Sequence, residues 1–156
     1  MVVEEGVHII ARNRKARHDF EILEEIEAGI VLAGAEVKSL REGRASFTDS
    51  YARVEDAEVW LFNLHITPYE SAQFDVPDPK RPRKLLLHRR QIKKLRGLTA
   101  EAGLTLVPLD LHFRRGYAKV MLGVARGRTR YDKREALKRK QAGREVDRAI
   151  RDARKD

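Results

Sequence analysis

The sequence predicts a mainly β fold in which about six antiparallel strands close into a small barrel, with two or three short helices beside them. Three observations support this class. Segments of alternating apolar and polar residues recur through most of the chain. Tight turns separate neighbouring segments, which favours antiparallel pairing. Apolar residues make up 42% of the 156 residues, enough for the core of one domain.

Two strands are expected before residue 33. The apolar run at 7–11 predicts a short edge strand, and a basic turn or single helical turn follows at 13–17. From residue 20 to residue 32 the chain alternates between apolar and polar residues, with Glu27 on the polar face. Residues 23–24 interrupt this alternation, so we expect the second strand to be bent or twisted there.

A short basic helix is expected at residues 33–44. Val37 and Leu40 lie three positions apart and form one apolar stripe, which predicts the buried side of the helix. Gly43 has no Cβ atom and adopts positive φ without strain, so it is expected to end the helix.

Residues 51–66 predict a hairpin whose two strands, 51–54 and 59–66, are joined by an acidic turn. Along the second strand every other residue is large and apolar, and we expect these side chains to face the interior: Trp60, Phe62, Leu64 and Ile66. Four prolines follow between residues 68 and 82, and they predict an irregular, mobile connection.

The last part of the fold is expected to contain a helix and two strands. The helix is expected from residue 88 to residue 96, where Gly97 ends it, with one further turn at 99–102. The strand at 104–113 changes its apolar face at Val107-Pro108, which predicts a bulge, and residues 117–124 form the final strand. A partly open barrel of the oligonucleotide-binding type fits this order of elements best.

The charge is distributed unevenly along the chain. The protein has 33 Lys and Arg against 24 Asp and Glu, a formal net charge of +9. Residues 80–96 contain nine cations and no acid, and residues 128–156 contain twelve cations against six acids. The remainder of the chain has a net charge of −6. An acidic body with a basic loop and a basic tail predicts a polyanionic partner, nucleic acid or an anionic surface.

Two domains are expected, a barrel at residues 1–127 and a basic tail at residues 128–156. The tail has few large aliphatic residues, so its apolar stripe is too thin to hold it on the body. It is nevertheless rich in helix-forming residues. We therefore expect the tail to be disordered alone and helical only against a partner.

No catalytic, metal or cofactor site is expected. The chain has no Cys, its five His share no metal-ligand spacing, and it has no glycine-rich phosphate loop. Glu24, Glu25 and Glu27 leave a two-metal nuclease open, but their spacing fits an exposed strand face better. No signal peptide and no apolar run of about 20 residues is present. We therefore expect a cytoplasmic protein that does not engage a membrane.

Several side chains are chemically suited to RNA. Arg83 and Lys84 belong to the cation-rich run without acids, and such cations release counterions when they meet phosphates. Tyr131, the aromatic residue of the basic tail, can stack on a base. Glu27 and Glu36 either accept hydrogen bonds from base amino groups or orient neighbouring Lys and Arg, and we favour the second interpretation.

A set of motifs in fixed order is similar to the SmpB family, the partners of transfer-messenger RNA. The motifs are Asn13-Arg14-Lys15-Ala16, Glu27-Ala28-Gly29, Glu36-Val37-Lys38-Ser39-Leu40-Arg41, Asp49-Ser50-Tyr51, His65-Ile66, Pro68-Tyr69, Arg83-Lys84-Leu85-Leu86-Leu87-His88 and Asp132-Lys133-Arg134. The resemblance implies a non-catalytic adaptor that binds the tRNA-like domain of transfer-messenger RNA. It further implies delivery of that RNA to bacterial ribosomes stalled on messages without a stop codon.

The resemblance also implies roles for individual positions. RNA binding in the family depends on positions that match Glu27, Leu86 and Lys119. The segment near the RNA face includes Lys38, Ser39 and Arg41. The tail is expected to enter the empty message channel and reach the small-subunit decoding centre with Tyr131, Asp132, Lys133 and Arg134. Elongation factor Tu with GTP is an expected further partner, joined through the RNA complex.

Two other classes were weighed against this one. A general single-strand binder would present stacking aromatics on an open strand face, whereas Phe20, Trp60, Phe62 and Phe113 are expected on inward faces. A structural protein of the ribosome would bind mature subunits in fixed proportion and would not select one small RNA.

Overall fold

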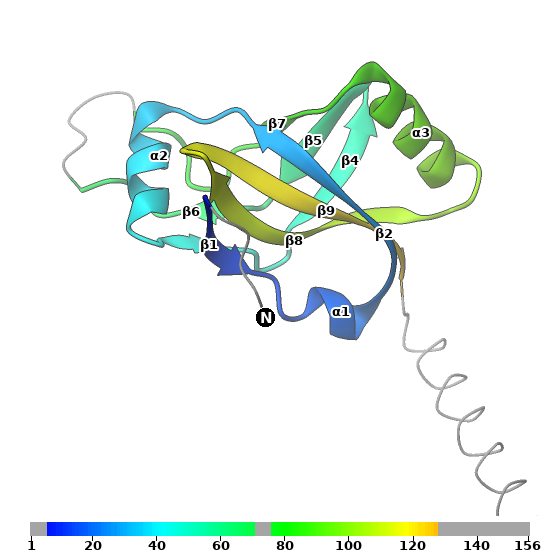
Figure 1. The fold of residues 1–156 in the computed structure, drawn as a ribbon, viewed down its shortest axis with the longest axis horizontal. Helices are drawn as coiled ribbons and strands as arrows, with labels where there is room; N and C mark the ends of the chain where they lie inside the picture. The colour runs from blue at the N-terminus through cyan, green and yellow to red at the C-terminus, as the bar shows by residue number, and fades with distance from the viewer. Residues whose placement is uncertain (1–5, 71–75, 128–156) are drawn as a thin grey trace, which may run out of the picture. The chain divides into compact units, whose positions relative to one another are not determined.

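The structure is a computed structural model that describes residues 6–70 and 76–127. Residues 1–5, 71–75 and 128–156, including the whole expected tail and Tyr131 to Arg134, lie outside the described residues. The chain divides into two units, Met1–Arg126 and Gly127–Asp156. Figure 1 shows the helices and strands of the first unit.

Six strands hydrogen-bond into a closed ring in the order β8-β4-β5-β7-β2-β9, which confirms the predicted antiparallel barrel. The ring consists of β2 (Phe20–Ile30), β4 (Tyr51–Glu55), β5 (Glu58–Phe62), β7 (Arg83–Leu86), β8 (Thr105–Arg114) and β9 (Tyr117–Gly127). The expected edge strand is β1 (Val7–Arg12), which pairs with β8 outside the ring. β3 (Ala45–Ser46), which was not expected, pairs in a separate sheet with β6 (His65–Ile66), the end of the strand expected at 59–66.

Three helices connect the strands. α1 (Ala16–Asp19) is the expected single turn, and α2 (Gly34–Arg41) is the expected short basic helix. α3 (Arg89–Ala100) lies at the other end of the barrel from α2 (Figure 1). Gly43 has φ of 72° just beyond the end of α2, so the predicted stop is confirmed.

Aliphatic side chains fill the interior of the ring. Alternate residues of β9 contribute to this core, as the regular pattern of the last strand predicted: Ala118, Val120, Leu122 and Val124. A second, smaller cluster lies beneath α1 and contains Ala16, Val107, Leu109 and Ala125 together with Phe20, Ile22 and Met121. The two clusters share β8, because a register shift between Pro108 and Asp110 turns the strand from one cluster to the other. The predicted bulge is therefore present, about one residue later than expected.

The inward face of β5 was predicted wrongly. Val59 and Leu61 are fully buried in the core, whereas Trp60 and Phe62 lie on the opposite face and are half-buried. Asn63, with φ of 60°, breaks the alternation, so that the apolar residues after it return to the core. The larger rings thus cover the outside of the barrel, while the narrower interior holds branched aliphatic side chains.

Three further expectations are corrected. β2 is one continuous strand whose alternation persists through residues 23–24, with Leu23 exposed on the same side as Glu27. The mobile connection was expected at residues 68–82, and the residues after it were expected only to lead into the helix, but they form β7, a ring strand between β5 and β2. α3 continues through Gly97, because Leu98 packs against the core and outweighs the roughly 1 kcal/mol cost of a helical glycine.

Candidate nucleic-acid interface

The outer surface of β2, β7 and β9 brings together the three residues for which the resemblance implied RNA binding. Leu86 on β7 pairs with Gly29 on β2, and Glu27 lies two residues earlier on the same face of β2. Glu27 in turn reaches His112 on β8, whose cross-strand neighbour on β9 is Lys119. Leu86, Glu27 and Lys119 therefore lie along one continuous stretch of surface.

Leu86 is presented outward by its neighbour on β2. The backbone of Gly29 approaches so closely that a Cβ atom there would lie 3.1 Å from the Cβ of Leu86. Leu86 remains 53% exposed, an unusual position for a leucine within a strand of a closed ring. An exposed aliphatic side chain at this point can contact a ribose or a base edge.

Glu27 is held by two partners on β8. Its Oε2 lies 2.9 Å from His112 Nε2, and Arg114 Nε donates to Oε2 at 2.9 Å and to Oε1 at 3.2 Å. The other ring nitrogen of His112, Nδ1, lies 2.5 Å from Asp110 Oδ1. Burial would raise the pKa of Glu27, but the hydrogen bonds from His112 and Arg114 outweigh it and lower this pKa below 4.5.

Both oxygens of Glu27 are thus occupied by protein donors. The carboxylate orients Arg114, whose side chain is still about one-third exposed, rather than offering a free acceptor to a base. This geometry agrees with the orienting role that we favoured for the acidic residues. The sequence did not single out Asp110, His112 or Arg114, although their period-two spacing along β8 places them on one face.

Arg83 is a correction to the expected phosphate contacts. Its side chain is fully buried, and its Nε donates to Glu36 Oε2 at 2.8 Å. Two backbone carbonyls, of Leu64 and Pro79, accept its remaining hydrogen bonds. Burial lowers the pKa of this guanidinium, and the ion pair with Glu36 opposes that effect. Arg83 therefore joins α2 to the barrel and is not available to RNA in this structure.

Glu36 is the centre of this buried network. Its Oε1 accepts a hydrogen bond from the backbone N–H of Ala33 at 2.9 Å, which caps the start of α2, and also contacts Arg81. Burial would raise the pKa of Glu36, but the hydrogen bonds from Arg81, Ala33 and Arg83 lower it below 4.5. The buried side of α2 is thus formed by Glu36, Ser39 and Leu40, where Val37 and Leu40 were expected.

The other expected body residues differ in their accessibility. Ser39 is buried and its Oγ donates to the carbonyl oxygen of Thr67 at 2.6 Å, so it too has a structural role here. Lys38 and Arg41 are exposed on α2, and the Lys38 ammonium lies 5.5 Å from the centre of the Tyr69 ring. Lys84 is half-buried on β7 with its Nζ 3.4 Å from Glu58 Oε1.

The carboxylates that left a nuclease open do not converge. Glu24 pairs with Lys94, Glu25 pairs with Arg17, and Glu27 pairs with His112 and Arg114. Over residues 6–70 and 76–127, no group of three His, Asp or Glu side chains is placed to hold a metal ion.

Outward-facing aromatics change the argument against a general single-strand binder. Tyr51 stacks on Phe62 with ring centroids 5.2 Å apart, and the Arg53 guanidinium lies 4.9 Å from the Phe62 centroid. The expected inward orientation of Phe62 and Trp60 was wrong, so that part of the argument fails. The Phe62 ring is nevertheless already covered by these protein neighbours, and Tyr51 is the more exposed ring of this stacked pair.

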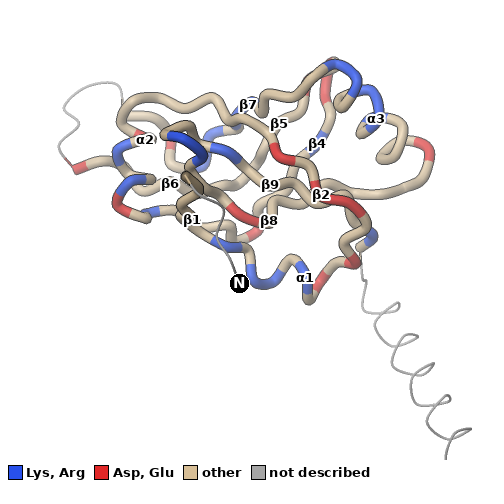
Figure 2. Tube along the Cα trace, in the orientation of Figure 1, with Lys and Arg blue, Asp and Glu red and all other residues tan. Residues whose placement is uncertain are grey.

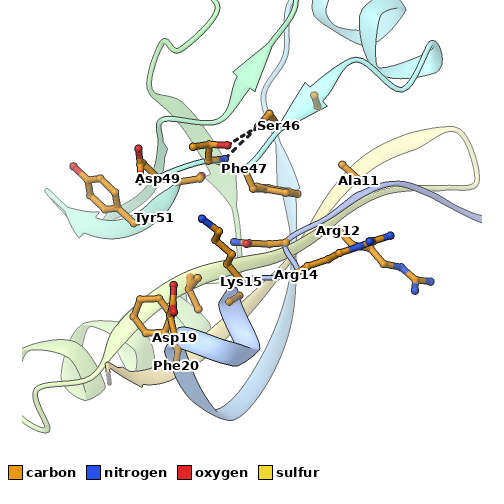
Figure 3. Close-up of a pocket in the computed structure, with 16 residues that line it drawn as sticks. Ala11, Arg12, Arg14, Lys15, Asp19, Phe20, Ser46, Phe47, Asp49 and Tyr51 are labelled. Carbon is orange, nitrogen blue, oxygen red and sulfur yellow. Dashed lines mark hydrogen bonds between the residues drawn. The ribbon is translucent and has the colours of Figure 1, made fainter. Parts of the chain in front are cut away.

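A recess of about 670 Å³ lies elsewhere on the body, between the β1–α1 connection and the segment before β4. Figure 3 shows Lys15 extending into it between Phe20 and Phe47, whereas Arg12 and Arg14 extend together away from it. Asp19 and Asp49 also line the recess, so its charge is mixed. An anion would interact less favourably with this recess than with a surface that carries only positive charge. We therefore assign the recess no function.

Comparison with known proteins covers nearly the whole chain. The family sequence model described as SmpB protein matches residues 10–152. The SsrA-binding protein of Carboxydothermus hydrogenoformans is 56% identical over 92% of this chain and 96% of its own length. The SsrA-binding protein of Acidothermus cellulolyticus is 56% identical over 96% of this chain and 94% of its own. A solved structure described as "tmRNA-SmpB: a journey to the center of the bacterial ribosome" superimposes with a TM-score of 0.66 at 55% identity, over 81% of this chain and 93% of that one.

Proposed function

Because this chain belongs to the SmpB family, we propose that it binds the tRNA-like domain of transfer-messenger RNA and delivers that RNA to stalled ribosomes. The family is one of RNA-binding proteins, not of enzymes. The relatives are named for binding SsrA, and the similar solved structure concerns tmRNA, SmpB and the bacterial ribosome. Over the described part of the chain, no helix is long and apolar enough to cross a membrane.

The face formed by Glu27, Leu86 and Lys119 is the proposed RNA grip. The observation that carries this assignment is the Glu27–Arg114 pair, because it fixes a partly exposed guanidinium before RNA arrives. A preorganised cation loses less side-chain entropy when it meets a phosphate. Leu86 adds an apolar contact beside it, so the face reads the shape and backbone of folded RNA rather than a base sequence.

The tail carries the second half of the proposed mechanism. Residues 128–156 enter a message channel that is empty, become helical there, and place Tyr131 in the decoding centre with Asp132, Lys133 and Arg134 beside it. Elongation factor Tu with GTP accompanies the complex by binding the RNA. The high charge and low apolar content of the tail support coupled folding and binding.

Substitution of Glu27 tests the grip. Glu27→Gln removes a negative charge from the RNA face, so simple electrostatics predicts tighter binding. Our account predicts the opposite, a loss of roughly 5- to 30-fold, because Arg114 is no longer held in place, at about 1–2 kcal/mol for a charged hydrogen bond. The measurement is a titration against the tRNA-like domain of transfer-messenger RNA.

Glu25→Gln is the matched control for that titration. Glu25 lies on the same strand, is exposed, and pairs with Arg17. Its loss should leave affinity unchanged or slightly higher. Equal or tighter binding by Glu27→Gln would contradict the orienting role of this residue.

Occupancy of the message channel tests the tail. We expect the RNA–protein complex to be accommodated on ribosomes that hold a truncated message, and to be excluded when a long message fills the channel. The measurement is the fraction of ribosomes that accept the complex, compared at equal concentrations for the two messages. Undiminished accommodation on the filled channel would contradict steric control by the tail.

A further inference from the structure

A groove of about 530 Å³ lies between α3 and the β5–β7 pair. Cations line it from both sides, with Lys84 on β7 and Arg89, Lys93 and Arg96 on α3. The acid that lines it, Glu58, already lies against Lys84 at 3.4 Å. The groove therefore presents positive charge along its helical wall.

The helical wall is built by sequence spacing. Arg89, Lys93 and Arg96 are separated by four and three residues, so they project from one face of α3. Ile92 and Leu95 are buried on the adjoining face and fix the helix against the barrel. Figure 2 shows the Lys and Arg positions of α3 as blue segments of the tube.

The three helical cations form no ion pair within the described part of the chain. Lys94, on another face of α3, forms an ion pair with Glu24. In contrast, Arg89, Lys93 and Arg96 are exposed and have no carboxylate partner among residues 6–70 and 76–127. Unpaired, aligned cations beside a groove favour a ligand with regularly spaced negative charges.

The groove is continuous with the proposed RNA grip. Leu86 lines the groove and also adjoins Gly29 on the face that contains Glu27. The first and last of the helical cations are seven positions apart, about 10 Å at about 1.5 Å per residue. This length matches roughly three stacked nucleotides at about 3.4 Å each.

We propose that this groove holds a stretch of phosphodiester backbone of the bound RNA, with Arg89, Lys93 and Arg96 contacting successive phosphates. The inference rests on the proposed function and extends it, since it carries the RNA footprint from Glu27 and Lys119 past Leu86 to α3. Charge complementarity, together with the continuity of the groove with the proposed RNA grip at Leu86, favours nucleic-acid backbone as the occupant. An acidic protein partner is the competing occupant that the experiment distinguishes.

The test compares two double variants of the full chain. Lys93→Gln with Arg96→Gln removes two cations from the groove, and Arg90→Gln with Lys94→Gln removes two from the same helix outside it. Each variant and the unsubstituted chain are titrated against the tRNA-like domain of transfer-messenger RNA, and in parallel against ordinary tRNA, at several salt concentrations. The groove variant should lose roughly 10- to 100-fold in affinity at low salt, and the slope of log affinity against log salt should become shallower by about 1.5–2.

The decrease in log affinity of the control variant should be less than one third of the decrease for the groove variant. Lys93→Arg with Arg96→Lys, which keeps both charges, should retain the affinity of the unsubstituted chain. Thermal unfolding midpoints of all variants should agree within a few degrees, because every substituted side chain is exposed.

Three outcomes overturn the proposal. Equal losses of RNA affinity for the groove and control variants would show that α3 attracts RNA through its overall positive charge and that the groove is not occupied. Unchanged RNA affinity in the groove variant would show that no RNA backbone occupies the groove and would favour an acidic protein as its occupant. If the unsubstituted chain does not prefer the tRNA-like domain over ordinary tRNA, the proposed function itself fails, a result distinct from failure of the groove alone.

Discussion

At the scale of single residues, the buried pair of Glu36 and Arg83 is the most sensitive point of the fold. Glu36→Gln should lower the free energy of unfolding by about 3–5 kcal/mol at neutral pH, because it leaves the Arg83 charge buried without its partner. Chemical denaturation of the two proteins measures the difference. Glu42→Gln is the control, since Glu42 pairs with Arg44 in an exposed position and its loss should cost at most about 1 kcal/mol.

The same pair sets part of the acid sensitivity of the fold. The pKa of Glu36 is lower in the folded protein than its ordinary value of 4.5. Its ionised form therefore stabilises the fold above pH 4.5, and that contribution is lost as the pH falls through the folded pKa. The stability difference between the unsubstituted protein and Glu36→Gln should shrink steadily below pH 4.5. A difference that stays constant down to about pH 3 would contradict the ion pair as its source.

Sequence reasoning located the candidate site only in part. Glu27, Leu86 and Lys119 came from family resemblance, and the structure explains why they lie on one surface. A run of cations does not reveal which member turns inward, so Arg83 was taken for a surface residue although the β7 alternation directs it into the core with Leu85. His112 was missed because its partner Glu27 lies 85 residues away, and only the closed ring joins them.

At the scale of elements, regular alternation of apolar and polar residues predicted most strands of the ring. Strands without such alternation were missed or assigned the wrong inward face. β9 was recovered with its correct face, because residues 117–124 repeat one alternating pattern. β7 has only four residues and follows prolines, so its local signal is that of a loop. β5 carries apolar residues on both faces, which leaves periodicity unable to say which face is inward.

The hairpin between β4 and β5 offers a prediction at this scale. Asp56 and Ala57 form a two-residue turn and have φ of 49° and 61°, a conformation that disfavours a Cβ atom. Ala57→Gly should therefore raise the free energy of unfolding by roughly 0.5–1 kcal/mol. Ala35→Gly in α2 is the control, since it should destabilise the protein by a similar amount. Loss of stability in Ala57→Gly, measured by denaturation, would contradict this view of the turn.

At the scale of the whole molecule, acidic and basic residues are concentrated in different segments of the chain. Outside the two basic segments the net charge is −6, and acids lie along β2, whereas cations lie on α3 (Figure 2). A binding face placed between acidic and basic regions can orient an RNA as well as attract it. The basic tail supplies a second, separate attraction, and we propose that its target is the ribosome.

The central claim is this division of labour, and one titration tests it most directly. The full chain and a chain that ends at Gly127 are each titrated with the tRNA-like domain of transfer-messenger RNA, at several salt concentrations, with ordinary tRNA as competitor. We predict that both forms bind tightly and that both reject the competitor, because the body alone is the RNA grip. Loss of binding on truncation, or equal competition by ordinary tRNA, would contradict the account and indicate a general binder of polyanions.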